Sequence, residues 1–257
     1  MIYDCFTFFN ELDLLEIRCE ELKSLNINHV LIECNKTHSG LDKPFYFNKN
    51  KERFSKYNII HIMLDCQIET INPWVREIYQ RNHILNVLMD IASPNDNIII
   101  SDVDEIPRAS TIKDFCSDIS YLRMDNFYYW LNCRTDKQEW TSAFIVKYEY
   151  LSKSNLTPSE IRVKRKRDIF IPNAGWHFSW SGGINAIKTK LESFAHQEYN
   201  SKKYKTKERI ERAMDIGTNF MNDNNSLFEF IPMDDSFPKY VINNISKFKH
   251  LIKWNTK

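Results

Sequence analysis

Short apolar runs alternate with helical segments through the first hundred residues of the chain. Four of these runs have the length of strands, at residues 2–8, 29–34, 59–64 and 97–101. Between them, apolar residues recur at helical spacing over residues 11–24 and 73–92. Strands buried on both faces are near-continuous apolar runs, and parallel strands are usually joined by a helix. The pattern predicts an α/β fold with a mostly parallel central sheet flanked by helices.

The pattern changes after about residue 118. Further strands are predicted at residues 119–131, 143–148 and 175–181, and further helices at 184–195 and 207–220. We find no internal repeat and no low-complexity linker. We therefore expect one continuous domain with a first half over residues 1–118 and a second half over residues 119–257.

Composition argues against several classes of protein. The chain has 257 residues, is 42% hydrophobic and has a net charge of +1, so its total charge does not indicate a nucleic-acid partner. Its six cysteines are scattered, with no C-x-x-C pair and no zinc spacing. The N-terminus lacks the basic region of a signal peptide, and no apolar stretch is long enough for a membrane span. We expect a cytoplasmic location.

The fourth apolar run ends in three acids, Asp102, Asp104 and Glu105. A parallel strand delivers its carboxyl end to the crevice where open α/β sheets bind ligands. Because alternate side chains of an extended segment share a face, Asp102 and Asp104 should point the same way. Neighbouring carboxylates repel each other unless a cation joins them, and a hard divalent metal suits carboxylate and phosphate oxygens. An exposed acidic loop is the alternative, but the position after a buried strand favours a site for Mn²⁺ or Mg²⁺.

Other phosphate-binding and metal-binding motifs are absent from the sequence. The five glycines form neither a P-loop nor the G-x-G-x-x-G fingerprint of dinucleotide-binding proteins. An EF-hand loop needs a glycine where this chain has Ile106 and Pro107. These absences leave the D-x-D sequence as the strongest chemical signal.

Four motifs follow one another along the chain: YDCFTFFNE at 3–11, ECNKTHSG at 33–40, SDVDEIP at 101–107 and AGWHFSW at 174–180. Together they resemble glycosyltransferase family 17, whose best-known activity is β-1,4-mannosyl-glycoprotein 4-β-N-acetylglucosaminyltransferase. The likeness extends along nearly the whole chain, with residues 190–194 and 196–200 adding to it. The resemblance implies a GT-A fold, a UDP-N-acetylglucosamine donor and an inverting, Mn²⁺- or Mg²⁺-dependent transfer to a glycan or other sugar acceptor. The donor would bind the first half, and the acceptor the second.

In a GT-A fold the first two strand ends form the nucleotide pocket, which predicts donor contacts from Phe8, Asn10, Glu11 and Glu33. Glu33 could accept a hydrogen bond from uracil or ribose, or be a surface acid. Arg76, on the long helix, could face the diphosphate. On the same helix, Glu77 and Arg81 are four residues apart in the favourable order, which predicts an intrahelical ion pair.

His177 lies in the alternating run 176–180, close to three of the five glycines. Glycine in a strand often marks close backbone approach, so we expect His177 to be a further metal ligand or a donor to the diphosphate. His196 is the competing histidine. Most single histidines have only a structural role.

An inverting transfer also needs a carboxylate that takes the acceptor's proton. Glu198 is the first candidate for this base and Asp235 the second, with Glu105 and Glu139 left open. An ordinary surface acid is an equally good interpretation of Glu198.

The six residues 162–167 form a basic run, either a solvated flank or a loop that folds over the leaving UDP. Two other functions remain open at this stage. One is a haloacid-dehalogenase-like, Mg²⁺-dependent phosphohydrolase with Asp102 as nucleophile, although its motif normally follows the first strand. The other is a non-catalytic carbohydrate-binding protein, consistent with the 14% aromatic content.

Overall fold

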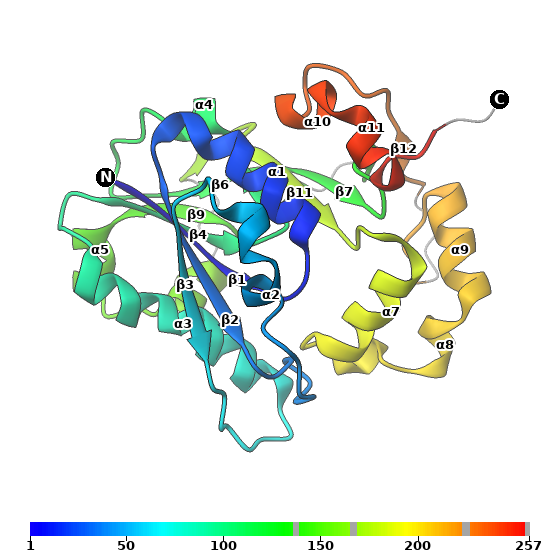
Figure 1. Cartoon of the computed structure of the whole chain (residues 1–257), viewed down its shortest axis with the longest axis horizontal. Helices are drawn as coiled ribbons and strands as arrows, with labels where there is room; N and C mark the ends of the chain where they lie inside the picture. Colours follow the sequence, from blue (N-terminus) through cyan, green and yellow to red (C-terminus); the bar gives the residue numbers. More distant parts are fainter. Residues whose placement is uncertain (136–138, 165–168, 223–226, 255–257) are drawn as a thin grey trace.

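The computed structural model describes residues 1–135, 139–164, 169–222 and 227–254. Its larger sheet has the strand order β10-β6-β9-β4-β1-β2-β3 (Figure 1). The bounds are β1 (Ile2–Phe8), β2 (Asn28–Cys34), β3 (Ile59–Leu64), β4 (Asn97–Asp102), β6 (Ile119–Leu122), β9 (Phe144–Lys147) and β10 (Phe170–Ile171). Four of its six pairings are parallel, and β9 runs antiparallel between β4 and β6. The predicted α/β class with a mostly parallel central sheet is confirmed.

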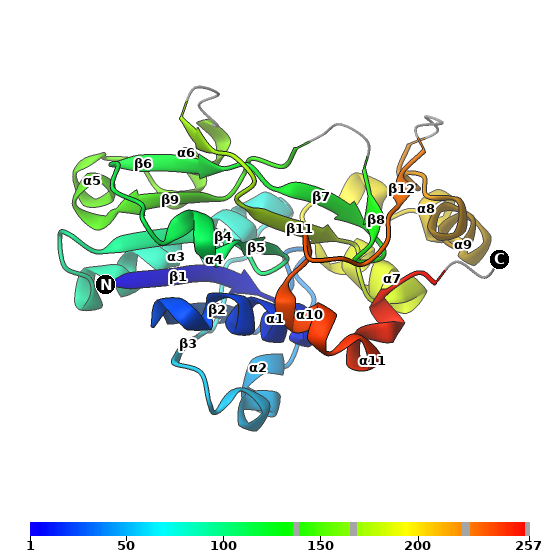
Figure 2. The same cartoon turned by 90° about the horizontal axis from the view of Figure 1, so that it is seen from above.

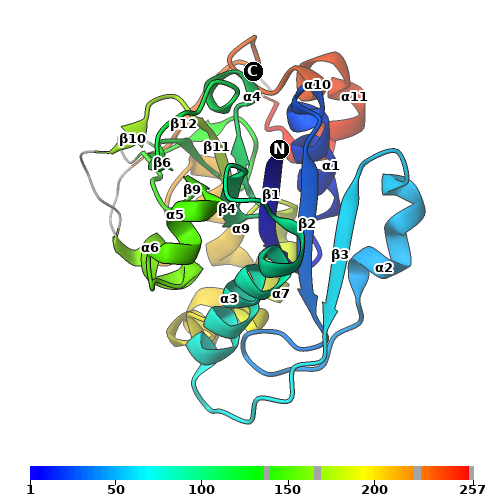
Figure 3. The ribbon, with the colours of Figure 1, turned by 90° about the vertical axis from the view of Figure 1, so that its left-hand side faces the viewer.

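Strands β1, β2 and β3 run side by side (Figure 3), with β1 paired to both β2 and β4. This order brings the carboxyl ends of β1, β2 and β4 to the same edge of the sheet. The larger sheet also draws β6, β9 and β10 from beyond residue 118, so it includes strands from both halves of the chain.

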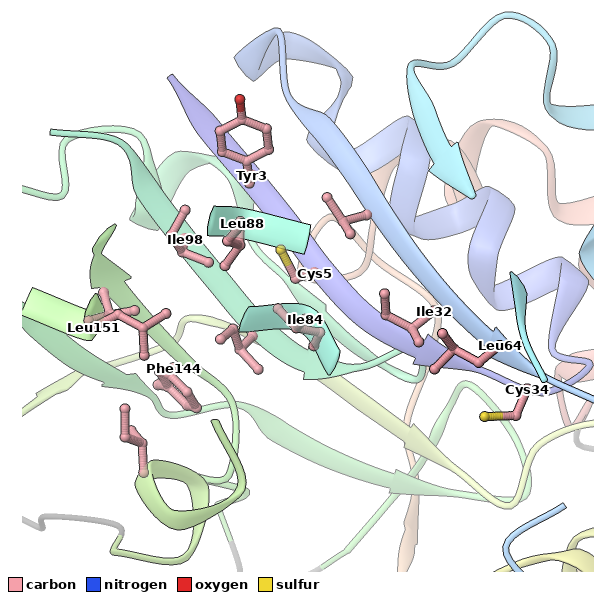
Figure 4. Packing of buried hydrophobic residues seen from close by; sticks show 14 of the residues in the cluster. Tyr3, Cys5, Ile32, Cys34, Leu64, Ile84, Leu88, Ile98, Phe144 and Leu151 are labelled. Carbon is pink, nitrogen blue, oxygen red and sulfur yellow. The ribbon is translucent and has the colours of Figure 1, made fainter. Parts of the chain in front are cut away.

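Helices cover both faces of this sheet. On one face, Ile84 and Leu88 of α3 (Pro73–Ile91) pack over Cys5, Ile32 and Ile98 (Figure 4). On the other, α1 (Leu12–Leu22) packs Leu15 and Cys19 against Phe6 and Leu31. The near-continuous apolar runs of β1, β2 and β4 are thus explained, because successive side chains enter different cores.

The helix α3 starts where the sequence predicts. Pro73 occupies its first turn, and the side chain of Asn72 accepts a hydrogen bond from the backbone N–H of Trp74. The predicted helix at 207–220 is shorter, because Gly217 adopts a left-handed conformation (φ 69°) and ends α9 (Lys207–Ile216).

A second sheet has the order β12-β8-β7-β11-β5 (Figure 2). Its strands are β5 (Glu105–Pro107), β7 (Asp125–Tyr128), β8 (Cys133–Arg134), β11 (Gly175–Ser179) and β12 (Glu229–Phe230). The single strand predicted at 119–131 is wrong, because the chain leaves the larger sheet after β6 and enters the second sheet at β7. The local pattern of the sequence does not reveal which sheet each strand joins. The strand predicted at 143–148 ends at Lys147, where α5 (Tyr148–Lys153) begins.

The remaining helices are short. They are α2 (Tyr46–Asn50), α4 (Ala109–Ile112), α6 (Pro158–Lys164), α7 (Gly183–Ser193), α8 (Lys202–Lys205), α10 (Lys239–Asn243) and α11 (Ile245–Phe248). α7, α8 and α9 lie together at the end of the molecule far from the N-terminus (Figures 1 and 2). In the described part of the chain, every helix is too short or too polar to cross a bilayer.

Candidate active site

A cavity of about 1330 Å³ opens at the carboxyl ends of β1 and β4. Its wall includes Phe8 at the end of β1, Asp102 at the end of β4, Glu11 and Asp104 in the turns that follow these strands, and Lys190 from α7. Ligands of open α/β sheets bind at this edge. Drug-sized ligand pockets are typically about 300–1,000 Å³, so this cavity has room for more than one small substrate.

Two arginines hold the carboxylate of Asp102. Arg81 of α3 donates to its Oδ1 at 2.8 Å, and Arg162 of α6 donates to its Oδ2 at 2.7 Å. Burial alone would raise the pKa of Asp102, but the charges of Arg162 and Arg81 outweigh it and keep that pKa well below its usual range. Asp102 is therefore ionised and already neutralised by the protein itself.

Asp104 has different neighbours. Its Oδ2 accepts a hydrogen bond from Lys190 Nζ at 3.0 Å, and its Oδ1 lies 3.9 Å from His177 Nε2. Burial alone would lower the pKa of Lys190. The negative charges of Asp104 and Glu11 outweigh this effect, so the pKa of Lys190 lies above its usual range. This amine is a permanent cation on the cavity wall.

His177 is held in one orientation. Its Nδ1 lies 2.9 Å from Asn126 Oδ1. Because an amide oxygen only accepts, Nδ1 donates and Nε2 keeps its lone pair. Burial lowers the pKa of His177, which favours the neutral ring. The ring of Trp140 stacks on it with centroids 4.2 Å apart.

Strand β11 brings His177 to the acidic turn. It pairs antiparallel with β5, so that His177 is opposite Glu105 and Gly175 is opposite Pro107. A Cβ at Gly175 (φ 149°) would lie 2.1 Å from the backbone oxygen of Ile106. Only glycine permits this approach.

The turn is fixed from behind by Arg18, whose side chain is fully buried. Its guanidinium donates to the backbone oxygens of Asp102 and Glu105 at 3.1 and 2.7 Å and to Ser101 Oγ at 2.6 Å. It also pairs with the buried carboxylate of Asp4. Burial alone would raise the pKa of Asp4, but its pairing with Arg18 and His29 lowers that pKa to about 2. This ionic network sets the backbone path of the acidic turn.

Of the residues predicted to contact the donor, Phe8 and Glu11 line the cavity. Asn10 lies outside its wall, and its N–H donates to Glu11 Oε2 at 3.0 Å. Burial and the charge of Asp104 raise the pKa of Glu11 despite the opposing charge of Lys190.

Glu33 and Arg76 lie outside the cavity wall. The carboxylate of Glu33 is fully buried and accepts from the backbone N–H groups of Tyr46 and Phe47, at the start of α2. The guanidinium of Arg76 donates to the backbone oxygen of His38 at 3.1 Å. The structure thus gives both side chains partners within the protein.

The predicted bases also lie outside the cavity wall. Glu198 is largely exposed and lies 2.6 Å from His196 Nδ1, although His196 itself lines the cavity. Asp235 is exposed in the segment before α10. Glu105 is fully buried, and both of its carboxylate oxygens pair with Arg162. Within the described ranges, the carboxylates that line the cavity belong to Glu11, Glu77, Asp102, Asp104 and Glu160.

The sequence interpretation missed the roles of three cations. The predicted ion pair of Glu77 and Arg81 is confirmed at 2.9 Å, but Arg81 also reaches Asp102. Arg162 opens the basic run 162–167, yet it is buried against the acidic turn rather than solvated. Residues 165–167 lie outside the described part of the chain. Lys190 belongs to the segment 190–194 that adds to the family resemblance, but the sequence predicted no function for it.

A divalent metal would find few protein ligands in this site. Among the residues that the structure describes, no group of three or more His, Cys, Asp or Glu side chains could hold a metal ion. Asp104 and His177 still fit, because Nε2 has a free lone pair beside a carboxylate and its ring is oriented by Asn126. Mg²⁺ is commonly held by one or two carboxylates together with substrate phosphates and water. The site therefore fits a metal that is shared with a diphosphate.

The profile of glycosyltransferase family 17 matches residues 1–256. A search of curated protein sequences gave no significant match. Among solved structures, S. aureus TarS 1–349 has a TM-score of 0.42 and 12% identity, covering 77% of this chain and 68% of that one. The same fragment in complex with UDP has a TM-score of 0.41 and 10% identity, covering 84% and 72%. The galactosyltransferase LgtC with donor and acceptor sugar analogues has a TM-score of 0.31 and 12% identity, covering 66% of each chain.

Proposed function

Because this chain belongs to glycosyltransferase family 17, and is therefore a glycosyltransferase, we propose that it transfers N-acetylglucosamine from UDP-N-acetylglucosamine to a sugar or glycan acceptor, with inversion. The observation that carries the proposal is the cavity in which Asp104, His177 and Lys190 meet at the carboxyl edge of the parallel strands. This is the edge at which β1 and β4 would receive a nucleotide.

The donor's diphosphate would bind at Lys190. Lys190 has a raised pKa and is the cation nearest Asp104. A fixed positive charge in a site shielded from water stabilises the negative charge that develops on the leaving UDP. Arg81 and Arg162 are already paired with carboxylates, so Lys190 would supply most of the positive charge that the diphosphate meets.

We propose that Asp104 and His177 also hold Mn²⁺ or Mg²⁺. When bound, such a metal supplies Lewis-acid stabilisation to the diphosphate. Each oxygen of Asp102 already accepts a hydrogen bond from an arginine, so its proposed part is to anchor Arg81 and Arg162 beside the donor.

Glu11 is the proposed general base. It lines the cavity near Asp104 and Lys190, and burial raises its pKa above the ordinary value, which makes the carboxylate a stronger base. Replacing Glu11 by Gln should lower kcat by about 10²–10⁴-fold with UDP affinity unchanged. A loss of UDP affinity with kcat preserved would instead make Glu11 a nucleotide contact, as the sequence predicted.

The phosphohydrolase alternative has less support. Its nucleophile would be Asp102, but this aspartate ends the fourth strand of the chain and is held by two arginines. The family match also identifies a glycosyltransferase, which excludes a purely non-catalytic binding protein.

The test is release of the nucleoside diphosphate from a panel of sugar donors, with Mn²⁺ and with EDTA. UDP-N-acetylglucosamine should be hydrolysed faster than UDP-glucose, UDP-galactose or GDP-mannose, and only with metal. Faster release from another donor would overturn the donor assignment, and equal rates in EDTA would overturn the metal.

A further inference from the structure

Large apolar side chains are exposed at one side of the cavity mouth. Trp74 and Ile78 lie about one turn apart on α3, and Val163 lies near the end of α6. All three line the cavity, yet they remain 38%, 44% and 79% exposed. Ile71, just before α3, is fully exposed, and Val75 is 38% exposed. The apolar wall of the cavity therefore continues onto the outer surface.

This side of the mouth gathers apolar side chains from two elements, because α3 and α6 pack against each other. On α3, Trp74 and Ile78 follow the same helical stripe as Leu85 and Leu88, so the apolar face of the helix runs from the core to the cavity mouth. The ring of Trp74 packs edge-on against His196, with centroids 4.6 Å apart, so it is held at the rim. Clustered exposed apolar groups rimmed by polar residues mark sites of interaction.

The chemistry of this rim matches hydrocarbon better than sugar or peptide. Ile78, Val163 and Ile71 have no hydrogen-bonding groups. Sugar hydroxyls and peptide groups placed against them would lose water without gaining partners, which is unfavourable. A hydrocarbon chain has no such groups to satisfy, and burial of apolar surface stabilises the complex.

We infer that the acceptor is a glycolipid, a saccharide attached to a hydrocarbon chain. Its sugar enters the cavity, and its chain lies along the rim formed by Trp74, Ile78 and Val163. The continuity of rim and cavity carries this inference, because one molecule then occupies both. The inference rests on the proposed function and names the acceptor class for the same site.

The experiment uses methyl, butyl, hexyl and octyl β-mannosides as probes, below their critical micelle concentrations and in the presence of UDP. Affinity should rise about threefold or more for each added pair of methylenes, since full burial of one CH₂ is worth about fourfold. In Ile78→Ser and in Val163→Ser, the slope of log affinity against chain length should fall to half of its original value or less. The control Met89→Ser, on α3 but outside the cavity wall and 68% exposed, should keep the full rise.

The outcomes separate the two proposals. An affinity series that is flat with chain length, while UDP binds normally, overturns the glycolipid acceptor and leaves the transferase proposal intact. Failure of UDP to bind overturns the proposed function first. A rise that Ile78→Ser and Met89→Ser reduce equally would indicate non-specific adsorption and overturn the inference. So would a concentration-dependent dimer that Ile78→Ser abolishes, because it would assign the rim to a second copy of the chain.

Discussion

The two aspartates of the acidic turn, Asp102 and Asp104, have different partners on the two sides of the turn. On the side of α3 and α6, Asp102 is paired with two arginines and has a strongly lowered pKa. On the side of α7 and β11, Asp104 meets one lysine and a neutral histidine whose Nε2 lone pair is free. We propose that the first carboxylate holds the arginines and that the second binds the ligand. The comparison teaches that a D-x-D sequence identifies a site without showing that its two acids have the same part.

The largest expected effect is on stability. It comes from replacing Arg18, whose buried guanidinium supports both sides of the acidic turn. Arg18→Met would leave the buried carboxylate of Asp4 without its main partner and the turn without its clamp. Breaking a buried ion pair in this way typically costs about 3–5 kcal/mol. We expect that loss in the free energy of unfolding, measured with urea.

The control for this variant is Arg134→Met, because Arg134 makes an exposed pair with Glu229. Its loss should be about 1 kcal/mol or less. Equal losses in the two variants would show that the Arg18 network does not support the turn as described.

Two matched variants test the difference between the acids directly. With Mn²⁺, UDP should raise the Tm of the protein, because a ligand stabilises the state that binds it. Asp104→Asn should lose the Mn²⁺-dependent part of this rise and about a hundredfold in kcat/KM. Asp102→Asn should keep the Mn²⁺-dependent part, while the apo protein loses stability, because two arginines lose an ionised partner. The opposite pattern, with Asp102→Asn alone losing the metal response, would reverse the assignment.

The smallest expected effect is on UDP affinity, and it concerns Lys190 alone. Lys190→Met should weaken UDP binding about tenfold, as expected for loss of one charge-assisted contact of roughly 1.5 kcal/mol. Uridine, which has no phosphate, should bind as before, and titration calorimetry measures both. Lys188→Met is the control, because Lys188 lies on the same helix but lines a separate pocket. An equal loss for uridine would show that Lys190 supports the pocket rather than the diphosphate.

Much of the fold follows from local patterns. The strands β1 to β4, the helix α3 with its Asn72 cap and the pairing of Glu77 with Arg81 were predictable, because each depends on residues close in the sequence. The strand at 119–131 was not, since only the pairing in space shows that β6 joins the larger sheet and β7 the second sheet.

The sequence by itself determined that an acid pair ends a buried strand in an α/β fold, and its motifs already resembled the family that the profile matches. Only the tertiary structure decided which cations meet those acids. Arg162 and Lys190 lie 60 and 86 positions away from their partners, Asp102 and Asp104. Likewise, Glu198 and Asp235 lie outside the cavity wall, although they are carboxylates in the second half. Electrostatic interactions act over a few ångströms in space, and sequence separation says little about which charges come that close.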